Sequence, residues 1–100
     1  MRLSEADIES IVNLANLHFG DDVQVFLFGS RANNQQQGGD IDLLIRNPNN
    51  GQLKIRAKIN FITDLILQIG DQKIDVVLEN QANKNSGFLK TIVQTAIRLC

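Results

Sequence analysis

The sequence is short of cysteine, of long apolar runs and of any excess of one charge, and each shortage excludes a class of protein. Cys100 is the only cysteine, so a single chain can form neither a disulfide framework nor a cysteine-based metal site. No apolar run approaches the ~18 residues that a membrane span requires. Residues 1–5 lack the pattern of a signal peptide. We therefore expect a cytoplasmic protein without a membrane partner.

Charge and length further restrict the class of protein to which the chain can belong. The 10 basic and 11 acidic residues leave a net charge of −1, so we expect no broad nucleic-acid surface. The charges are uneven, with 3 basic and 7 acidic residues in 1–50 and 7 basic and 4 acidic residues in 51–100. A length of 100 residues with a hydrophobic fraction of 43% predicts one globular domain, residues 1–100.

Hydrophobic periodicity predicts three helices. The first begins at a cap, Ser4, and ends at Gly20. The second covers residues 52–69, where five isoleucines follow one another at steps of 4, 3, 4 and 3 and predict a largely buried helix. The third begins at a cap, Ser86, and is predicted to continue to the end of the chain.

Three short apolar runs predict strands over residues 23–28, 40–45 and 73–78. Residues 30–39 are polar and end in two glycines, which predicts a helical turn followed by a loop. The order helix, strand, turn, strand, helix, strand, helix is typical of a small α/β (α+β) domain. We expect a mixed three-stranded sheet with the helices packed on one of its faces.

Three aspartates stand where two strands can bring them together. Asp40 and Asp42 are two residues apart on a predicted strand, so both side chains project from the same face. Asp75 lies between Ile74 and Val76 on the third predicted strand, which is a costly place for an acid that nothing uses. Oxygen-only ligands select Mg²⁺ or Mn²⁺. Three such carboxylates can hold two metal ions ~4 Å apart for in-line phosphoryl transfer.

A second element, upstream of the acids, can hold an anion. Gly29 follows a predicted buried strand and allows the backbone to approach a phosphate closely. Ser30 adds a hydroxyl at a helix N-terminus, and Arg31 adds a positive charge. An Asp-x-Asp pair alone is also compatible with a turn residue and water-facing acids that bind nothing. The anion site and the carboxylates together favour a metal-nucleotide site.

Residues 28–32 (Phe-Gly-Ser-Arg-Ala) and 39–45 (Gly-Asp-Ile-Asp-Leu-Leu-Ile) resemble the signature of the DNA polymerase beta-like nucleotidyltransferase superfamily. In that superfamily a Gly-Ser pair precedes a spaced Asp-x-Asp pair. The short chain resembles its minimal members, the MNT domains of bacteria and archaea, from the first predicted helix to the last. Two departures fall in the intervening loop: Asn33-Asn34 replaces a frequent Arg-Gly, and Gly39 replaces a frequent serine.

The resemblance implies a role for each of these residues. The triphosphate of ATP, or of another nucleoside triphosphate, is expected to be bound by Gly29, Ser30 and Arg31. The metal ion, Mg²⁺ or Mn²⁺, is expected to be bound by Asp40, Asp42 and Asp75. Asp75 completes one metal site and helps to deprotonate the attacking hydroxyl. The implied reaction transfers a nucleoside monophosphate, with AMP as the expected group, to an acceptor.

The resemblance also implies a partner. A chain of this length leaves few residues for an acceptor pocket, so a partner chain or a second copy is expected to supply it. MNT proteins often pair with a small all-α HEPN protein, a ribonuclease-like toxin, which they modify with AMP or mask. Transfer to a small molecule such as an aminoglycoside, and a non-catalytic binding module, are alternatives. A further alternative is a phosphatase or glycosyltransferase with an Asp-x-Asp pair. The Gly-Ser element would have no role in such an enzyme.

Other polar residues are open to more than one interpretation. His18, the only histidine, is expected near the end of the first helix in a surface or capping role, and the sequence shows no partner for it. Lys54, Arg56 and Lys58 fit either a solvated helix face or contact with phosphates or an acidic partner. Lys73, at the start of the third predicted strand, has the same two interpretations.

Overall fold

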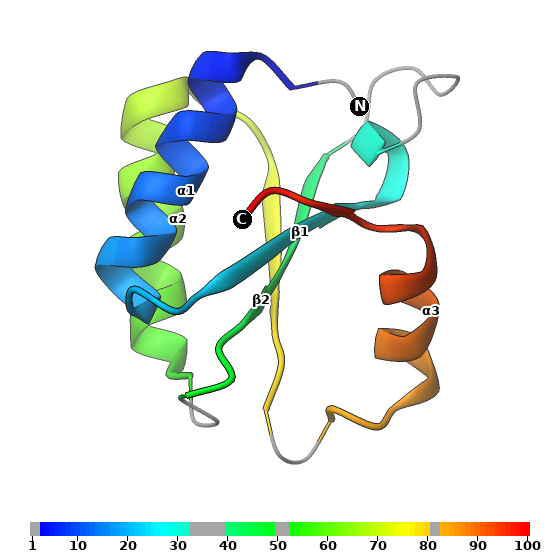
Figure 1. Ribbon diagram of the computed structural model, residues 1–100. Helices are drawn as coiled ribbons and strands as arrows, with labels where there is room; N and C mark the ends of the chain where they lie inside the picture. The colour runs from blue at the N-terminus through cyan, green and yellow to red at the C-terminus, as the bar shows by residue number, and fades with distance from the viewer. Residues whose placement is uncertain (1–2, 33–39, 50–52, 81–82) are drawn as a thin grey trace.

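A four-stranded sheet carries a pair of helices on one face and a single helix on the other (Figure 1). The computed structural model describes residues 3–32, 40–49, 53–80 and 83–100. Along the chain the elements are α1 (Glu5–Phe19), β1 (Gln24–Phe28), the 3₁₀ helix η1 (Gly29–Ala32), β2 (Ile41–Arg46), α2 (Ile55–Ile69), β3 (Ile74–Leu78), α3 (Gly87–Thr95) and β4 (Ile97–Arg98). No helix within these described ranges has the length and apolar character needed to cross a membrane.

Local sequence signals set the helix ends. The backbone N–H of Asp7 donates to Ser4 Oγ at 3.1 Å, so Ser4 caps α1. Gly20, at φ +101°, ends the same helix. The backbone N–H of Leu89 likewise donates to Ser86 Oγ at 3.1 Å and caps α3. The predicted starts of α1 and α3 and the predicted end of α1 are therefore confirmed.

The strand order of the sheet is β3-β2-β1-β4. β2 pairs in parallel with β3, with α2 as the crossover between them, while the β1–β2 and β1–β4 pairs are antiparallel. The register places Asp42 beside Asp75 on one side and beside Phe28 on the other. Segments that are far apart in the sequence thus meet at one end of the two central strands.

β2 is apolar on both faces, which explains why helices cover both. Its odd-numbered residues enter the larger core beneath α1 and α2. Leu44 packs instead with Leu89 and Ile92 of α3 on the opposite face. Because Leu44 is apolar, the face from which it projects is also covered by a helix. The expectation that all helices share one face therefore differs from the structure. Since Asp42 and Leu44 are two residues apart, Asp42 projects from the α3 face.

The C-terminal segment departs from the sequence prediction. The final helix was predicted to reach the chain end, and this is wrong: α3 ends at Thr95, and Ala96 takes an extended backbone with ψ 150°. The next residues add β4 to the edge of β1, where the N–H of Leu99 donates to the carbonyl of Val25 at 2.7 Å. This pairing satisfies backbone groups at the edge of β1, so the sheet has four strands rather than three.

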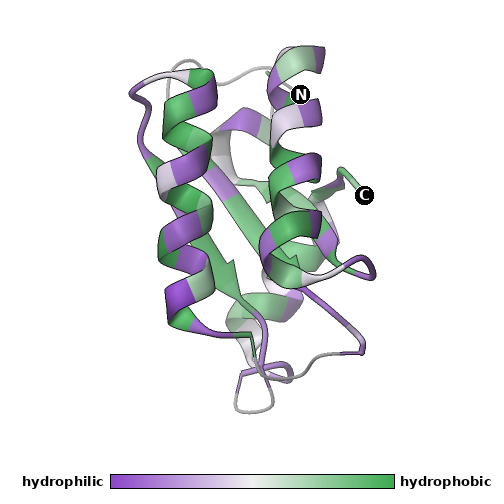
Figure 2. Ribbon diagram, turned by 90° about the vertical axis from the view of Figure 1, so that its left-hand side faces the viewer, coloured by the Kyte–Doolittle hydropathy of each residue, from purple (hydrophilic) through white to green (hydrophobic). Residues whose placement is uncertain are grey.

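α2 is less buried than its isoleucine stripe predicts. Within α2 only Phe61 and Leu65 are buried, whereas Ile55 and Ile59 are 71% and 56% exposed. The prediction of a largely buried helix is wrong because α2 lies on the outside of the molecule and packs only along its inner side, against α1 and the sheet. Figure 2 views α1 and α2 from outside and shows hydrophobic bands on their outward surface.

Candidate functional site

Three aspartate carboxylates converge at one end of the central strands. Asp40 immediately precedes β2, Asp42 is the second residue of β2, and Asp75 is the second residue of β3. The parallel register sets Asp42 directly beside Asp75. One carboxylate oxygen from each of the three residues lies within 4.8 Å of the others. The structure thus brings together the three acids that the sequence singled out.

The strands hold these carboxylates on a rigid base. Ile41 and Leu43, the neighbours of Asp42 in β2, are fully buried in the core on the opposite face. The N–H of Ile41 donates to the carbonyl of Lys73 at 3.0 Å, which joins the start of β2 to the start of β3. Side chains on packed strands have little freedom to move apart. The close approach of the three acids is therefore built into the sheet.

The environment of Asp42 disfavours its negative charge. Burial raises the pKa of the Asp42 carboxyl above its ordinary value, and repulsion from Asp75 and then from Asp40 raises it further. A hydrogen bond with Asp75 acts in the same direction, while the charge of Lys73 lowers the pKa. The net effect is that the pKa of Asp42 is raised. A cation placed among the carboxylates would lower this pKa again.

We expect the metal-free protein to lose stability as the pH rises from the ordinary aspartate range. Between 3.8 and the raised pKa, folded Asp42 keeps a proton that the unfolded chain has released, so a higher pH favours unfolding. Urea unfolding in EDTA at successive pH values measures this. The free energy of unfolding of the wild type should fall relative to that of Asp42→Asn across this window. Parallel pH profiles for the two proteins would contradict the assignment.

A lysine borders the acid cluster. Lys73 Nζ lies 3.5 Å from Asp40 Oδ2, with the lysine side chain 73% exposed. An exposed ion pair of this kind contributes little stability, so its significance is the positive charge it brings to an acidic edge. The role of Lys73 could not be assigned from the sequence, because only the parallel register of β2 and β3 places it near Asp40. Lys73 and Asp40 stand two residues before the registered pair Asp75 and Asp42.

Gly29 is required by two features of the site. Its backbone has φ +75°, a left-handed conformation that side chains disfavour. A Cβ atom at this position would also overlap the carboxylate of Asp42, which lies across the β1–β2 pair. Gly29 therefore provides the space that Asp42 occupies.

Gly29→Ala should lower the free energy of unfolding by about 1–3 kcal/mol, through backbone strain and the displacement of Asp42. Gly70→Ala is the matched control, because Gly70 has φ +100° but nothing within 4 Å of the added Cβ. Urea unfolding of both variants separates strain from overlap. Equal losses for the two variants would show that the overlap with Asp42 has no energetic consequence.

η1 follows β1 directly and lies against β2. Its 3₁₀ turn confirms the helical turn predicted after Gly29. Arg31 is half-buried, and its Nη2 donates to Gln72 Oε1 at 3.3 Å, which ties η1 to the segment before β3. The backbone of Ser30 belongs to η1, while its side chain is not among the parts of the chain that the structure describes. The predicted loop, with Asn33, Asn34 and Gly39, falls in residues 33–39, also outside the described residues.

The other polar candidates lie away from the carboxylates. His18 Nε2 is 2.7 Å from Asp64 Oδ2, so the histidine joins α1 to α2 with a partner that the sequence did not reveal. Lys54, Arg56 and Lys58 stand at the start of α2. Because α2 covers the face of the sheet opposite to Asp42, the structure does not bring these basic groups to the acid cluster.

Comparison with known proteins supplies a family. The family model described as "Polymerase beta, Nucleotidyltransferase" matches residues 9–100, a range that includes η1 and both acid-bearing strands. Among solved structures, a candidate nucleotidyltransferase from Sulfolobus solfataricus is 18% identical, with a TM-score of 0.48, and the match covers 98% of this chain and 89% of that chain. Comparison with curated proteins gives no match.

Proposed function

We propose that this chain, which belongs to the polymerase beta nucleotidyltransferase family, transfers AMP from ATP to a hydroxyl group of a protein. The observation that carries the proposal is the convergence of Asp40, Asp42 and Asp75 next to η1. Carboxylate oxygens at this spacing suit Mg²⁺ or Mn²⁺ better than softer metals. The raised pKa of Asp42 fits this donor set, because a divalent cation would relieve the repulsion that raises it.

The aspartates would bind the divalent cation and orient the acceptor. The cation supplies neutralising charge for the phosphates and for the attacking oxygen. In the reaction the acceptor oxygen forms a bond to the α-phosphorus, the bond from that phosphorus to the pyrophosphate oxygen breaks, and the hydroxyl proton leaves. We assign the proton to Asp75, the most exposed of the three acids, which also completes the metal site.

The triphosphate is assigned to η1. Gly29 and Ser30 would contact the phosphates, and Arg31 would contribute positive charge next to the departing pyrophosphate. The hydrogen bond from Arg31 to Gln72 supports this role, because it holds η1 against the segment that leads into β3, the strand that carries Asp75. The assignment leaves the opposite face of the sheet, with α1 and α2, without a direct part in the chemistry.

The proposed acceptor is a small all-α HEPN protein, which would make this chain the antitoxin of a cytoplasmic toxin–antitoxin pair. The likeness of residues 28–32 and 39–45 to MNT domains supports this partner. In this proposal the acceptor protein itself, or a second copy of this chain, would help to position the acceptor hydroxyl.

Calorimetry followed by mass spectrometry tests the proposal. ATP is titrated in Mg²⁺ buffer into the wild type and into the double variant Asp40→Asn, Asp42→Asn, and each protein is then incubated with ATP and the candidate HEPN partner. We expect metal-dependent binding and an adduct of ~329 Da, one AMP residue, on the partner with wild type only. The control is the double variant Asp21→Asn, Asp71→Asn, which removes two exposed acids outside the cluster.

Each other outcome contradicts a separate part of the proposal. Binding of ATP without an adduct on the partner would contradict the protein acceptor and favour a small-molecule acceptor. A folded wild type that binds no triphosphate would contradict nucleotidyl transfer and favour a binding module that inhibits by contact alone. Equal activity in the cluster variant and the control would remove Asp40 and Asp42 from the reaction.

A further inference from the structure

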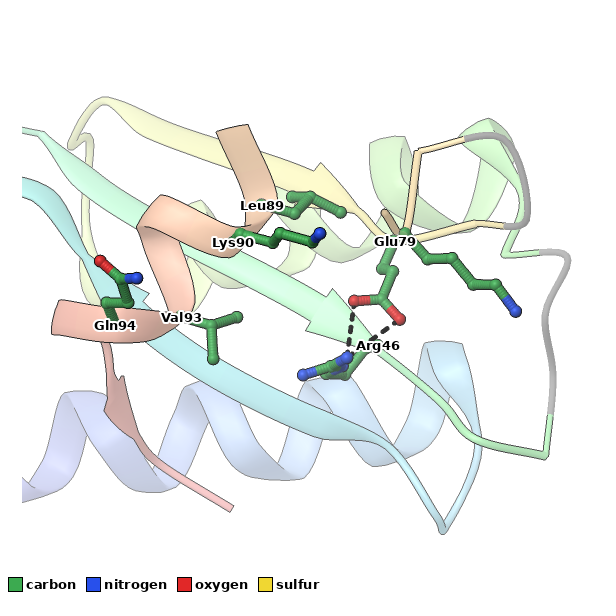
Figure 3. Close-up of a pocket in the computed structure, with 7 residues that line it drawn as sticks. Arg46, Glu79, Leu89, Lys90, Val93 and Gln94 are labelled. Atoms are coloured by element: carbon green, nitrogen blue, oxygen red, sulfur yellow. Dashed lines mark hydrogen bonds and ion pairs between the residues drawn. The ribbon is translucent and has the colours of Figure 1, made fainter. Parts of the chain in front are cut away.

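A second polar feature lies on the α3 face, away from the three aspartates. It is a pocket of about 360 Å³ between α3 and the far ends of β2 and β3 (Figure 3). The residues that define this α3 pocket include Arg46, Glu79, Lys84, Leu89, Lys90 and Val93. The sequence singled out none of them as a site, because they come from four separate segments.

An ion pair forms the floor of the α3 pocket. Arg46 Nη2 lies 2.9 Å from Glu79 Oε2 and 3.2 Å from Glu79 Oε1, and the glutamate side chain is only 16% exposed. The N–H of Glu79 donates to the carbonyl of Ile45 at 2.9 Å, which extends the ladder between β2 and β3. The guanidinium also lies 5.8 Å from the ring centre of Phe26. Packed this way, Arg46 neutralises Glu79.

The remaining charge in the α3 pocket is positive. Lys84 and Lys90 are both exposed, and the described residues offer neither of them an ion pair. Three basic residues and one acidic residue line the pocket, in a chain whose net charge is −1. Figure 3 shows Lys90 directed toward the Arg46–Glu79 pair. An incoming anion would therefore meet two lysines that form no ion pair with the described residues.

The wall of the pocket is apolar. Leu89 is buried, and Val93, one turn further along α3, is 41% exposed. A free phosphate gains nothing from such a wall, and bidentate recognition of a phosphate uses an unpaired arginine, or converging backbone N–H groups in its place. Arg46 is already paired with a carboxylate. The two lysines stand on separate segments, so each can pair with a carboxylate of its own beside the apolar wall.

The α3 pocket and the aspartates share one face of the sheet. Arg46 lies four residues after Asp42 in β2, so its side chain projects from the same face, ~13 Å away along the strand. α3 packs over Leu44 between them. Because α3 occupies the direct path, an extended polypeptide would pass beside α3 and need at least about four residues to reach from the pocket to the aspartates.

We propose that the α3 pocket binds an acidic segment of the acceptor polypeptide, about four or more residues from the hydroxyl that receives the nucleotide. Its carboxylates pair with Lys84 and Lys90, and an apolar neighbour packs on Leu89 and Val93. The pocket's role in choosing the acceptor rests on the proposed function, whereas peptide binding by the pocket does not.

A peptide titration tests this directly. The probe is a capped hexapeptide of alternating glutamate and leucine, and its counterpart has glutamine in place of glutamate. Both are added to the full chain in EDTA without nucleotide, while the backbone amide resonances of Leu89 and Val93 are followed. We expect saturable shifts with the glutamate peptide only, and Kd about tenfold weaker in the double variant Lys84→Gln, Lys90→Gln.

The control is the double variant Lys54→Gln, Arg56→Gln, which removes the same charge from the start of α2 on the opposite side of the sheet. It should bind as the wild type does. Equal weakening in both double variants, or no shift at Leu89 and Val93, would overturn the proposal. So would AMP or inorganic phosphate shifting these amides at lower concentration than the peptide. Because neither metal nor ATP is present, failure of AMP transfer leaves this result unaffected.

Discussion

Asp42→Asn is expected to abolish nucleotidyl transfer while leaving the metal-free protein folded and at least as stable as the wild type. Asparagine keeps the volume of aspartate but removes the charge that a divalent cation needs. Loss of a preorganised electrostatic group in an active site costs about a hundred- to a thousandfold in rate, and a metal ligand should reach the upper end of that range. Transfer is measured as formation of the AMP adduct under single-turnover conditions.

Stability should change in the opposite direction to activity. Burial together with the charges of Asp75 and Asp40 raises the pKa of Asp42, so the ionised residue opposes folding when no metal is bound. A neutral amide removes that repulsion. Urea unfolding in EDTA at neutral pH should therefore give an equal or higher midpoint for Asp42→Asn. A residue that served the fold alone would lose stability and activity together.

Asp71→Asn is the matched control, because Asp71 is an exposed acid shortly before β3 and lies outside the cluster of three carboxylates. It should change neither the rate nor the urea midpoint measurably. An unchanged rate in Asp42→Asn would remove Asp42 from the metal site. A stability loss of several kcal/mol in the same variant would show that its carboxylate is instead satisfied by the protein.

Phe61→Ala is expected to lower the free energy of unfolding by about 3–5 kcal/mol, a large part of the stability of a domain of this size. Phe61 is fully buried where α2 meets α1. Its ring centre lies 5.3 Å from that of Phe19 and 6.3 Å from that of His18, the latter in an edge arrangement. Truncation removes these contacts and leaves a cavity that two packed helices cannot close.

Phe88→Ala provides the comparison, since Phe88 is a phenylalanine of α3 whose side chain is 55% exposed. Its loss should change the free energy of unfolding by about 1 kcal/mol or less. Chemical unfolding of both variants, with the slope of the transition compared, separates a core defect from a change in the unfolded chain. Similar losses for the two phenylalanines would contradict the packing of α2 on α1 through Phe61.

Several features of the fold could be predicted from the sequence because their causes are local. The cap at Ser4 acts within one helical turn, and Gly20 ends the same helix through its own backbone. Alternation in the run after Asp40 separates the acids from the buried residues of β2. The spacing of Asp40 and Asp42, with Asp75 on a later strand, was enough to select the acids that converge. Their binding of a metal stays a prediction.

Other features had no local signal. The isoleucine spacing of α2 indicates an apolar stripe but not how much of it finds cover, so the exposure of Ile55 was not foreseen. The last helix stops at Thr95 because the edge of β1 offers backbone partners from a distant part of the chain. The pairing of His18 with Asp64 joins residues 46 positions apart.

The sequence by itself therefore determined the starts of α1 and α3, the strand alternation and the identity of the acids, since these depend on residues within a turn or on one face of one strand. Only the tertiary structure decided which strands are neighbours. The parallel register of β2 and β3 places Asp42 beside Asp75 at one end and Arg46 beside Glu79 at the other. Long-range packing chooses that register, because it lets both faces of β2 be covered at once.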